Sequence, residues 1–220
     1  MTPLPSSDPI SLFLVLMALA VLPFAAMVVT SYTKIVVVLG LLRNAIGVQQ
    51  VPPNMVLNGV ALIVSCYIMS PVLMEAAQGM GLTGTNAPAS NAQQLLQAAD
   101  SAREPFRRFL KRHAAEREKL FFLKSAAIIW PAAQAQNLQA DDLIVLAPAF
   151  LLTELAAAFR IGFLLYLAFI VIDIVIANVL LAMGLSQVTP TNVAIPFKLL
   201  LFVVLDGWSR LVHGLVLTYR

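Results

Sequence analysis

The chain has 220 residues, of which 60% are hydrophobic and 11% are charged, and its net charge is +3. Soluble domains carry about 25% charged residues, so this composition excludes an ordinary soluble domain and favours a membrane protein. Eight of the 14 basic residues lie at positions 103–124 with acids among them, so we expect no nucleic-acid partner. Cys66 is the single cysteine, and His113 and His213 are far apart in the sequence, so we expect no metal site.

Two apolar segments open the chain. Residues 10–29 contain no charge and number twenty, which is the length that a helix needs to cross a bilayer. A cleaved signal peptide is the alternative for this segment. The second segment, residues 55–74, follows Pro52 and Pro53, which suit a helix start. We interpret residues 30–54 as the connection between the two helices.

A hydrophilic segment follows at residues 76–147. Its first part, residues 79–91, is rich in Gly, Ala, Ser, Thr and Asn and predicts a loop. Apolar residues then recur at three- and four-residue spacing from Leu95 to His113, opposite a basic face, which predicts an amphipathic helix. Pro105 is expected to break this helix or to begin a new one.

Two further apolar segments complete the chain. Residues 151–183 are long for one membrane span, and residues 195–219 form the last segment. The fold class is therefore all-α, with four long apolar helical segments in hairpins and a hydrophilic helical insertion between the second and third. We divide the chain into an N-terminal hairpin (1–75), the hydrophilic segment (76–147) and a C-terminal hairpin (148–220).

Basic residues in the short connections indicate an orientation. Lys34 and Arg43 lie in the first connection, and Lys198 directly follows the last. The positive-inside rule then makes both connections cytoplasmic and puts the hydrophilic segment on the periplasmic side.

Charged residues interrupt the last two apolar segments. Each Asp or Arg facing lipid at a helix centre would cost about 2.5–3.5 kcal/mol, so these groups need partners. Asp206 and Arg210 are four residues apart and can pair on one helix face, and Lys198 is a candidate partner for Asp173. Glu154 suits the positive end of a helix dipole. Two interpretations stay open: helix or subunit contacts, or an ion relay.

Two stretches carry a family resemblance. "APAFLLTELAAAFRIGFLLYLAFIVIDIVIANVLLAMG" and "PTNVAIPFKLLLFVVLDGW" resemble the FliP/SctR family of the type III export apparatus. The hydrophilic "PFRRFLKRHAAEREKLFFL" is similar to the family's middle segment. The short region before the first apolar segment is more similar to the injectisome branch (SctR, HrcR, YscR) than to the flagellar one.

The resemblance implies a machine component without catalytic residues or cofactors. Family members assemble as a homo-pentamer with SctS-like and SctT-like subunits in the bacterial inner membrane, around a gated pore for unfolded polypeptides. The expected assembly contacts are Glu154, Phe159, Arg160, Asp173, Lys198, Asp206, Trp208 and Arg210.

The expected pore gate lies in the loop near residues 183–190. Its residues are Met183, Gly184, Leu185, Ser186, Gln187 and Val188, although many relatives have a run of methionines here and this chain has "MGLSQV". A simple turn between hairpin arms is the other interpretation of this loop. The alternative function is an ion-coupled secondary transporter that titrates Asp173 and Asp206, although the inverted repeats typical of transporters are not evident.

Overall fold

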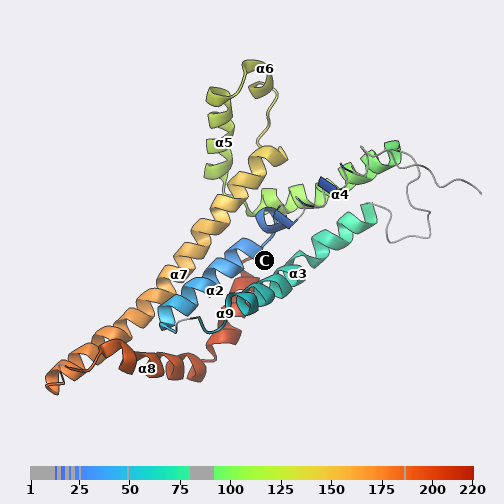
Figure 1. Cartoon of the computed structure of the whole chain (residues 1–220). Helices are drawn as coiled ribbons and strands as arrows, with labels where there is room; N and C mark the ends of the chain where they lie inside the picture. The colour runs from blue at the N-terminus through green and yellow to red at the C-terminus, as the bar shows by residue number, and fades with distance from the viewer. Residues whose placement is uncertain are drawn as a thin grey trace, which may run out of the picture.

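The computed structural model describes residues 26–48, 50–79, 92–185 and 187–220, together with positions 13, 16, 17, 20, 23 and 24. Every regular element in these ranges is an α-helix, which confirms the all-α prediction (Figure 1). Most of the first predicted apolar segment, residues 10–29, lies outside the described residues, and so does the predicted loop 79–91 apart from Gly79.

The central helix is α2, Tyr32–Ile46, which packs against both α7 and α3. Its fully buried side chains recur at three- and four-residue spacing and include Ile35, Val38, Leu39 and Leu42. We expected residues 30–54 to be a connection, and this is wrong for the part that forms α2. Fifteen residues are too few to cross a bilayer, but they are enough for a helix that is buried by protein on several sides.

The second apolar segment forms α3, Asn54–Gly79, and the hydrophilic segment begins with α4, Ala92–His113. The two helices lie side by side (Figure 1). The predicted amphipathic character of α4 is confirmed, because Phe109 and Leu110 are buried. Pro105 does not break α4 but lies inside it. The cost of an internal proline, about 3 kcal/mol, is offset here by the burial of these two side chains.

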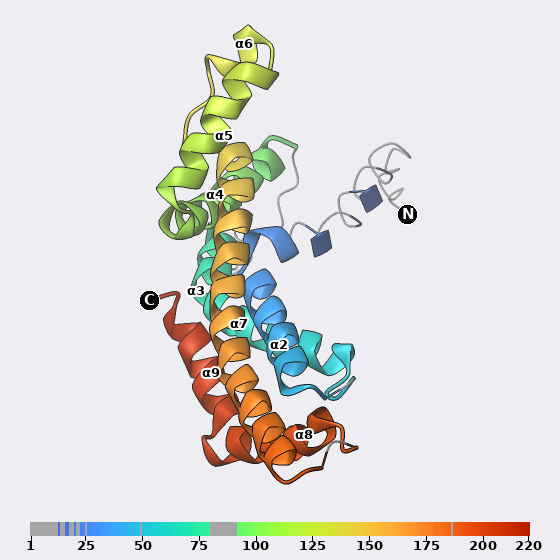
Figure 2. The same cartoon turned by 90° about the vertical axis from the view of Figure 1, so that its left-hand side faces the viewer.

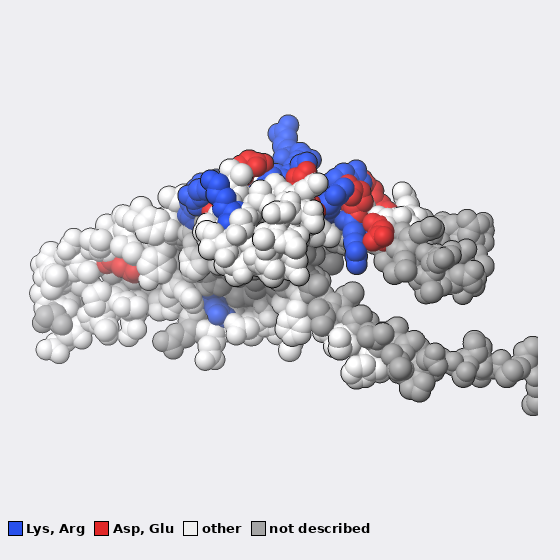
Figure 3. Space-filling view, turned by 90° about the horizontal axis from the view of Figure 1, so that it is seen from above, with Lys and Arg blue, Asp and Glu red and all other residues white. Residues whose placement is uncertain are grey.

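Two helices, α5 (Glu116–Ile129) and the short α6 (Ala132–Ala135), project beyond the rest of the chain (Figure 2). The charged residues gather over this end of the molecule, whereas the opposite arm is almost free of charge in the same view (Figure 3). Exposed ion pairs account for several of these charges, including Arg108–Glu75 at 2.5 Å and Lys111–Asp141 at 2.5 Å. The charge cluster of the sequence is therefore mostly a solvated face.

The C-terminal part consists of α7 (Leu143–Ala182), α8 (Pro190–Val204) and α9 (Gly207–Leu217). The helix α7 has 40 residues and forms the long axis of the molecule (Figure 1). The fourth apolar segment is not one straight helix, because α8 and α9 meet at an angle of 62°. The bend lies at Asp206, whose backbone is left-handed with φ 52°.

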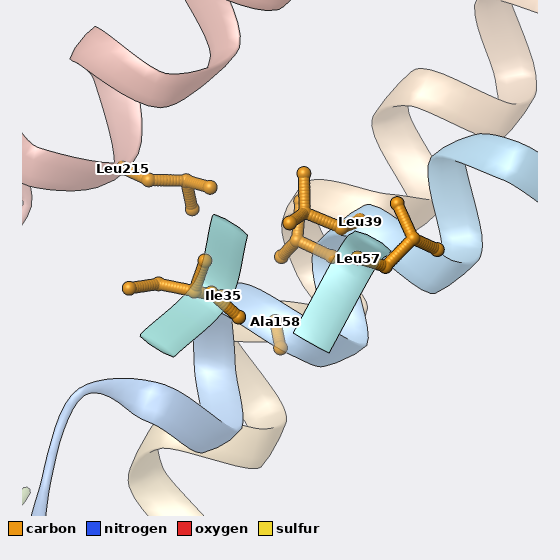
Figure 4. Packing of buried hydrophobic residues seen from close by; sticks show 7 residues of the cluster. Ile35, Leu39, Leu57, Ala158 and Leu215 are labelled. Atoms are coloured by element: carbon orange, nitrogen blue, oxygen red, sulfur yellow. The ribbon is translucent and has the colours of Figure 1, made fainter. Parts of the chain in front are cut away.

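The main core lies where four helices converge. Ile35 and Leu39 of α2 meet Leu57 of α3, Ala158 of α7 and Leu215 of α9 (Figure 4). Gly162 of α7 permits the close approach of α2, because a Cβ atom there would lie 2.2 Å from Cδ1 of Leu41. The N-terminal and C-terminal parts of the chain therefore share one core, built around α2.

Two described helices, α3 and α7, are long and apolar enough to cross a membrane, and the bent pair of α8 and α9 would make a third span. Only nine of the 40 residues of α7 are buried within the chain, so most of this apolar helix needs lipid or protein around it. The division at residues 75 and 147 and the orientation stay predictions. Lys34 and Lys198, on which the orientation partly depends, are buried residues of helices rather than loop residues.

Candidate functional site

The turn between α7 and α8 contains the predicted gate residues. Gly184 adopts φ 72°, and the N–H of Leu185 donates to the carbonyl oxygen of Leu180 at 3.0 Å. This pattern is a Schellman ending, for which glycine is the preferred residue. The turn lies at the far tip of the long arm formed by α7 and α8 (Figure 1).

The side chains of the turn point outward. Met183 is 62% exposed, and Leu185, Gln187 and Val188 are exposed as well, while Ser186 lies outside the described residues. An exposed set of flexible or branched apolar side chains at a helix tip can contact matching tips of other subunits. The gating role of this loop stays a prediction.

Asp173 and Lys198 form an ion pair, as the sequence analysis suggested. The Nζ atom of Lys198 lies 2.7 Å from Oδ2 of Asp173 and donates a second hydrogen bond to the carbonyl oxygen of Ala45 at 3.2 Å. Ala45 is in the last turn of α2, where a cation is favourable. One lysine therefore joins α8, α7 and α2. The Oδ1 atom of Asp173 is shielded and has no hydrogen-bond partner within the described residues.

Glu154 is the centre of a second polar cluster, and this one is buried. Its Oε1 lies 3.1 Å from Nζ of Lys34, and both side chains are only 4% exposed. Its Oε2 accepts a hydrogen bond from the hydroxyl of Tyr219, and the Lys34 ammonium lies 3.8 Å from the centre of the Tyr219 ring. The helix-dipole explanation for Glu154 is wrong, because α7 begins at Leu143, about three turns earlier.

Aromatic rings enclose the Tyr219 side of this cluster. Phe109 stacks on Tyr219 with ring centres 6.1 Å apart, and His113 meets the same ring edge-on at 5.3 Å. Burial and the Glu154 carboxylate raise the pKa of Tyr219, so its hydroxyl stays protonated and donates. Burial, together with the charges of Arg112 and Lys34, lowers the pKa of His113 to about 4. His113 is therefore neutral at pH 7.

Sequence reasoning missed the roles of Lys34 and Tyr219. From the sequence alone, Lys34 is a charge in the connection between two apolar segments, and no pattern marks Tyr219 as a functional residue. The available signal was a lone lysine directly before the apolar run "IVVVLGLL", which indicates a charge that needs a buried partner. The partner could not be named, because Lys34 and Glu154 are 120 residues apart in the sequence.

The expected pair of Asp206 and Arg210 does not form. Asp206 precedes α9 in a left-handed conformation, so its side chain does not share a helix face with Arg210. Its Oδ1 instead accepts a hydrogen bond from the hydroxyl of Ser209 at 3.0 Å. Arg210 is exposed and has no ion-pair partner among the described residues.

Gly207 and Trp208 fix the geometry of the bend. A Cβ atom on Gly207 would lie 2.3 Å from the Phe202 ring, so only glycine fits without movement of that ring. Trp208 meets the same ring edge-on, with centres 5.4 Å apart. The "DGW" motif therefore makes the bend through close contact with α8.

The remaining predicted contact residues, Phe159 and Arg160, lie on the outer surface of α7. Phe159 is 54% exposed, and Arg160 is exposed without an ion-pair partner in the described ranges. Of the predicted assembly residues, Glu154 and Lys198 are buried inside the chain, and the half-exposed Asp173 is paired with Lys198. The side chains of the other five are exposed, although Trp208 also packs on Phe202; they are Phe159, Arg160, Asp206, Trp208 and Arg210. Nor do the described residues bring together three side chains suited to hold a metal ion.

Comparison with known proteins identifies the family. A sequence model described as the FliP family matches residues 15–215. The hypersensitivity response secretion protein HrcR of Ralstonia nicotianae is 69% identical over 210 residues, which cover 96% of this chain and 97% of the relative. The Yop proteins translocation protein R of Yersinia pestis is 49% identical over 212 residues, with coverages of 96% and 97%. The virulence protein YscR of Salmonella typhimurium is 38% identical over 217 residues, with coverages of 98% and 99%. The chain therefore belongs to the FliP family, among its SctR-type proteins of type III secretion.

Proposed function

We propose that the chain is a core subunit of the export apparatus of a type III secretion system in the bacterial inner membrane. In this proposal several copies, five by family resemblance, surround a gated pore together with SctS-like and SctT-like subunits. Unfolded polypeptides pass through the pore, and the subunit itself catalyses no reaction. The names of the relatives, which refer to secretion and translocation, support this assignment.

The observation that carries the proposal is the outward surface of α7 to α9. This surface is apolar, yet it includes the arginines Arg160 and Arg210, neither of which has an ion-pair partner in the described part of the chain. Each would cost about 2.5–3.5 kcal/mol if it faced the centre of a bilayer. Neighbouring subunits or a water-filled lumen remove this cost, so the surface suits an assembly better than a lone protein in lipid.

The alternative function, an ion-coupled transporter, would titrate Asp173 and Asp206. The contacts of these two carboxylates give it little support. Asp173 is already paired with Lys198 at 2.7 Å, and Asp206 accepts a hydrogen bond at the entrance to α9. Both carboxylates therefore already have a partner within the chain, which accounts for them without proton transport.

The main experiment is the mass of the detergent-solubilised particle. The chain, co-expressed with its SctS-like and SctT-like neighbours, is expected in a particle that contains several copies of it and both neighbours. Recovery of the co-expressed chain only as a monomer or simple dimer, without either neighbour, would contradict the proposal.

Lys198→Ala and Asp206→Ala are expected to reduce the amount of assembled particle before they affect conduction. Lys198 joins three helices, and Asp206 shapes the bend that other subunits would contact. Arg117→Ala is the matched control, because this side chain is 89% exposed on α5. Intact particles with blocked export in both variants would favour a direct transport role instead.

The gate is tested separately. Replacement of residues 185–187 with glycines is expected to increase ion leak through the assembled particle, because glycines remove the side chains that would close the pore. Glycines at residues 137–139, in the turn between α6 and α7, are the control. Equal leak in the two variants would show that the α7–α8 loop is only a turn.

A further inference from the structure

Two opposite charges at the bend between α8 and α9 have no ion-pair partner in the described part of the chain. They are Asp206 and Arg210, and both side chains are exposed. The left-handed backbone of Asp206, with φ 52°, keeps its side chain off the helix face of Arg210. Its Oδ1 accepts a hydrogen bond from Ser209, and a carboxylate has about four acceptor sites in all. Asp206 can therefore still accept hydrogen bonds from a cation outside its own chain.

Most of the other acids already have partners inside the chain. Ten of the 11 acidic residues are described, and eight of these form ion pairs within the chain. Asp142 is the other described acid without an ion pair, and it directly precedes α7. It is about 40 Å along α7 from Phe169, which packs on Phe202 beside the bend. Among the described residues, Asp206 is thus the acid at the bend that is free to pair with a second copy.

The two charges lie at nearly the same level along the molecule. Helix α9 runs alongside α7 (Figure 2), and Asp206 and Arg210 are one helical turn apart, which is about 6 Å. Spanning helices stand on average about 20° from the membrane normal, so α7 and α9 are nearly parallel to the axis of a ring in the membrane. Copies in a closed ring are related by rotation without translation, so groups at the same level meet. The long arginine side chain can bridge the remaining difference.

Neither Arg160 nor a different protein suits Asp206 as well. Arg160 is about 14 Å from Phe169 along α7, and therefore lies well away from the level of the bend. A different protein would have to supply both an acid and a base at this level. A second copy of the chain carries both groups, one for each unpaired charge.

We propose that Asp206 of each copy pairs with Arg210 of the adjacent copy, which makes the bend between α8 and α9 a contact between copies. This inference rests on the proposed assembly of several copies. The contact is head-to-tail: each copy uses its acid on one side and its base on the other, so a closed ring leaves neither charge unpaired. A guanidinium and a carboxylate bind through two parallel hydrogen bonds, which fixes the geometry of the contact.

Charge reversal tests the pair. Asp206→Lys or Arg210→Asp alone places like charges at every contact between copies, so the amount of multi-copy particle is expected to fall about tenfold or more. Both reversals in one chain should restore the particle, because each contact pairs again. Asp206→Lys combined with Arg160→Asp is the matched control. It should not restore the particle, because the new lysine still faces Arg210.

Co-expression of two different chains shows whether the pair forms between copies. A tagged Asp206→Lys chain and an untagged Arg210→Asp chain repel their own kind but pair with each other in both directions. The tagged chain is therefore expected to recover the untagged one, in a larger amount of particle than either variant gives alone. A pair within one chain would show no such complementation.

Milder variants cover the case in which a reversed chain does not fold. Lysine suits the left-handed backbone of Asp206 less well than aspartate does, so urea unfolding of each purified chain accompanies the assay. If Asp206→Lys unfolds, Asp206→Asn and Arg210→Gln replace the reversals, because asparagine tolerates this backbone. Each should lower the amount of particle, and the double variant should lower it no further than the stronger single variant. In the unfolding of the separate chain, by contrast, the two effects should add.

The outcomes are distinct. Restoration by the double reversal together with complementation between separate chains supports the pair, and so does non-additive loss of particle in the neutral variants. If the wild-type particle forms but the double reversal does not restore it, or the control with Arg160→Asp restores it equally, the pair is overturned and the proposed function stands. Restoration without complementation, or additive loss in the neutral variants, also overturns the pair. A wild-type chain that forms no multi-copy particle contradicts the proposed function itself.

Discussion

Removing one member of the buried pair of Lys34 and Glu154 should destabilise the chain far more than removing both. The informative variants are Lys34→Met, Glu154→Gln and their combination. Methionine keeps the length of the lysine side chain, and glutamine keeps an oxygen that can accept the hydrogen bond from Tyr219. The variants therefore change charge with little change in volume.

The magnitude follows from burial. Both side chains are 4% exposed and their charged atoms are 3.1 Å apart, so either charge alone would stay buried without its partner. Breaking a buried pair in this way costs about 3–5 kcal/mol, so the two single variants together should lose about 6–10 kcal/mol. The double variant leaves no buried charge and should lose about 1–3 kcal/mol, which is the cost of imperfect repacking. The two substitutions should thus be strongly non-additive.

The assay is urea unfolding of the purified chain in mild detergent, followed by helical circular dichroism. Arg108→Met, Glu75→Gln and their combination are the control, because this pair is 61% and 51% exposed and should contribute about 1 kcal/mol or less. If a single variant unfolds completely, Lys34→Arg offers a milder perturbation that keeps the charge. Additive losses in the buried pair, or losses no larger than in the surface pair, would refute the reasoning.

Three further predictions concern single residues. Gly162→Ala should destabilise the chain by about 1–3 kcal/mol, because the new Cβ would lie 2.2 Å from Cδ1 of Leu41. Gly40→Ala is the control and should not destabilise the chain, because no atom lies within 4 Å of the new Cβ. Urea unfolding measures both variants. Gly207→Ala should displace the Phe202 ring and change the emission of Trp208, and unchanged emission would contradict the packing described at the bend. His113 has a pKa of about 4 against an ordinary 6.5, so the unfolded chain binds more protons between these values. Its contribution to stability should be complete above pH 6.5 and decline as the pH falls toward 4, and thermal unfolding of His113→Phe should show a weaker pH dependence in that window.

Hydrophobic pattern and composition were sufficient for the helical class, for α3 and for the amphipathic α4. They failed for α2, because a fifteen-residue apolar run is too short to be recognised as a membrane-spanning helix. Only the tertiary structure shows that this run is surrounded by protein and need not reach across a membrane. The sequence therefore predicted the helices that face outward better than the helix in the core.

The contacts of the charged residues also include some that could be predicted from the sequence and some that could not. The pair of Asp173 and Lys198 could be suggested because the two lie 25 residues apart on consecutive helices. The contacts of Glu154 with Lys34 and Tyr219 span 120 and 65 residues, a separation at which no local rule applies. The predicted pair of Asp206 and Arg210 failed for a local reason, because it required a continuous helix where Asp206 is left-handed.

The position of α2 explains why some charges are satisfied and others are not. Lys34 near its start pairs with Glu154, and the carbonyl oxygen of Ala45 at its end accepts a hydrogen bond from Lys198. The buried cluster at Glu154 and the half-buried pair of Asp173 and Lys198 therefore fasten this one helix to the C-terminal helices, at its two ends. Arg160 and Arg210 are exposed, and no described acid forms an ion pair with either of them. Variants of the first group should thus impair folding of the subunit, while variants of Arg160 and Arg210 should leave the subunit folded and weaken what binds outside it.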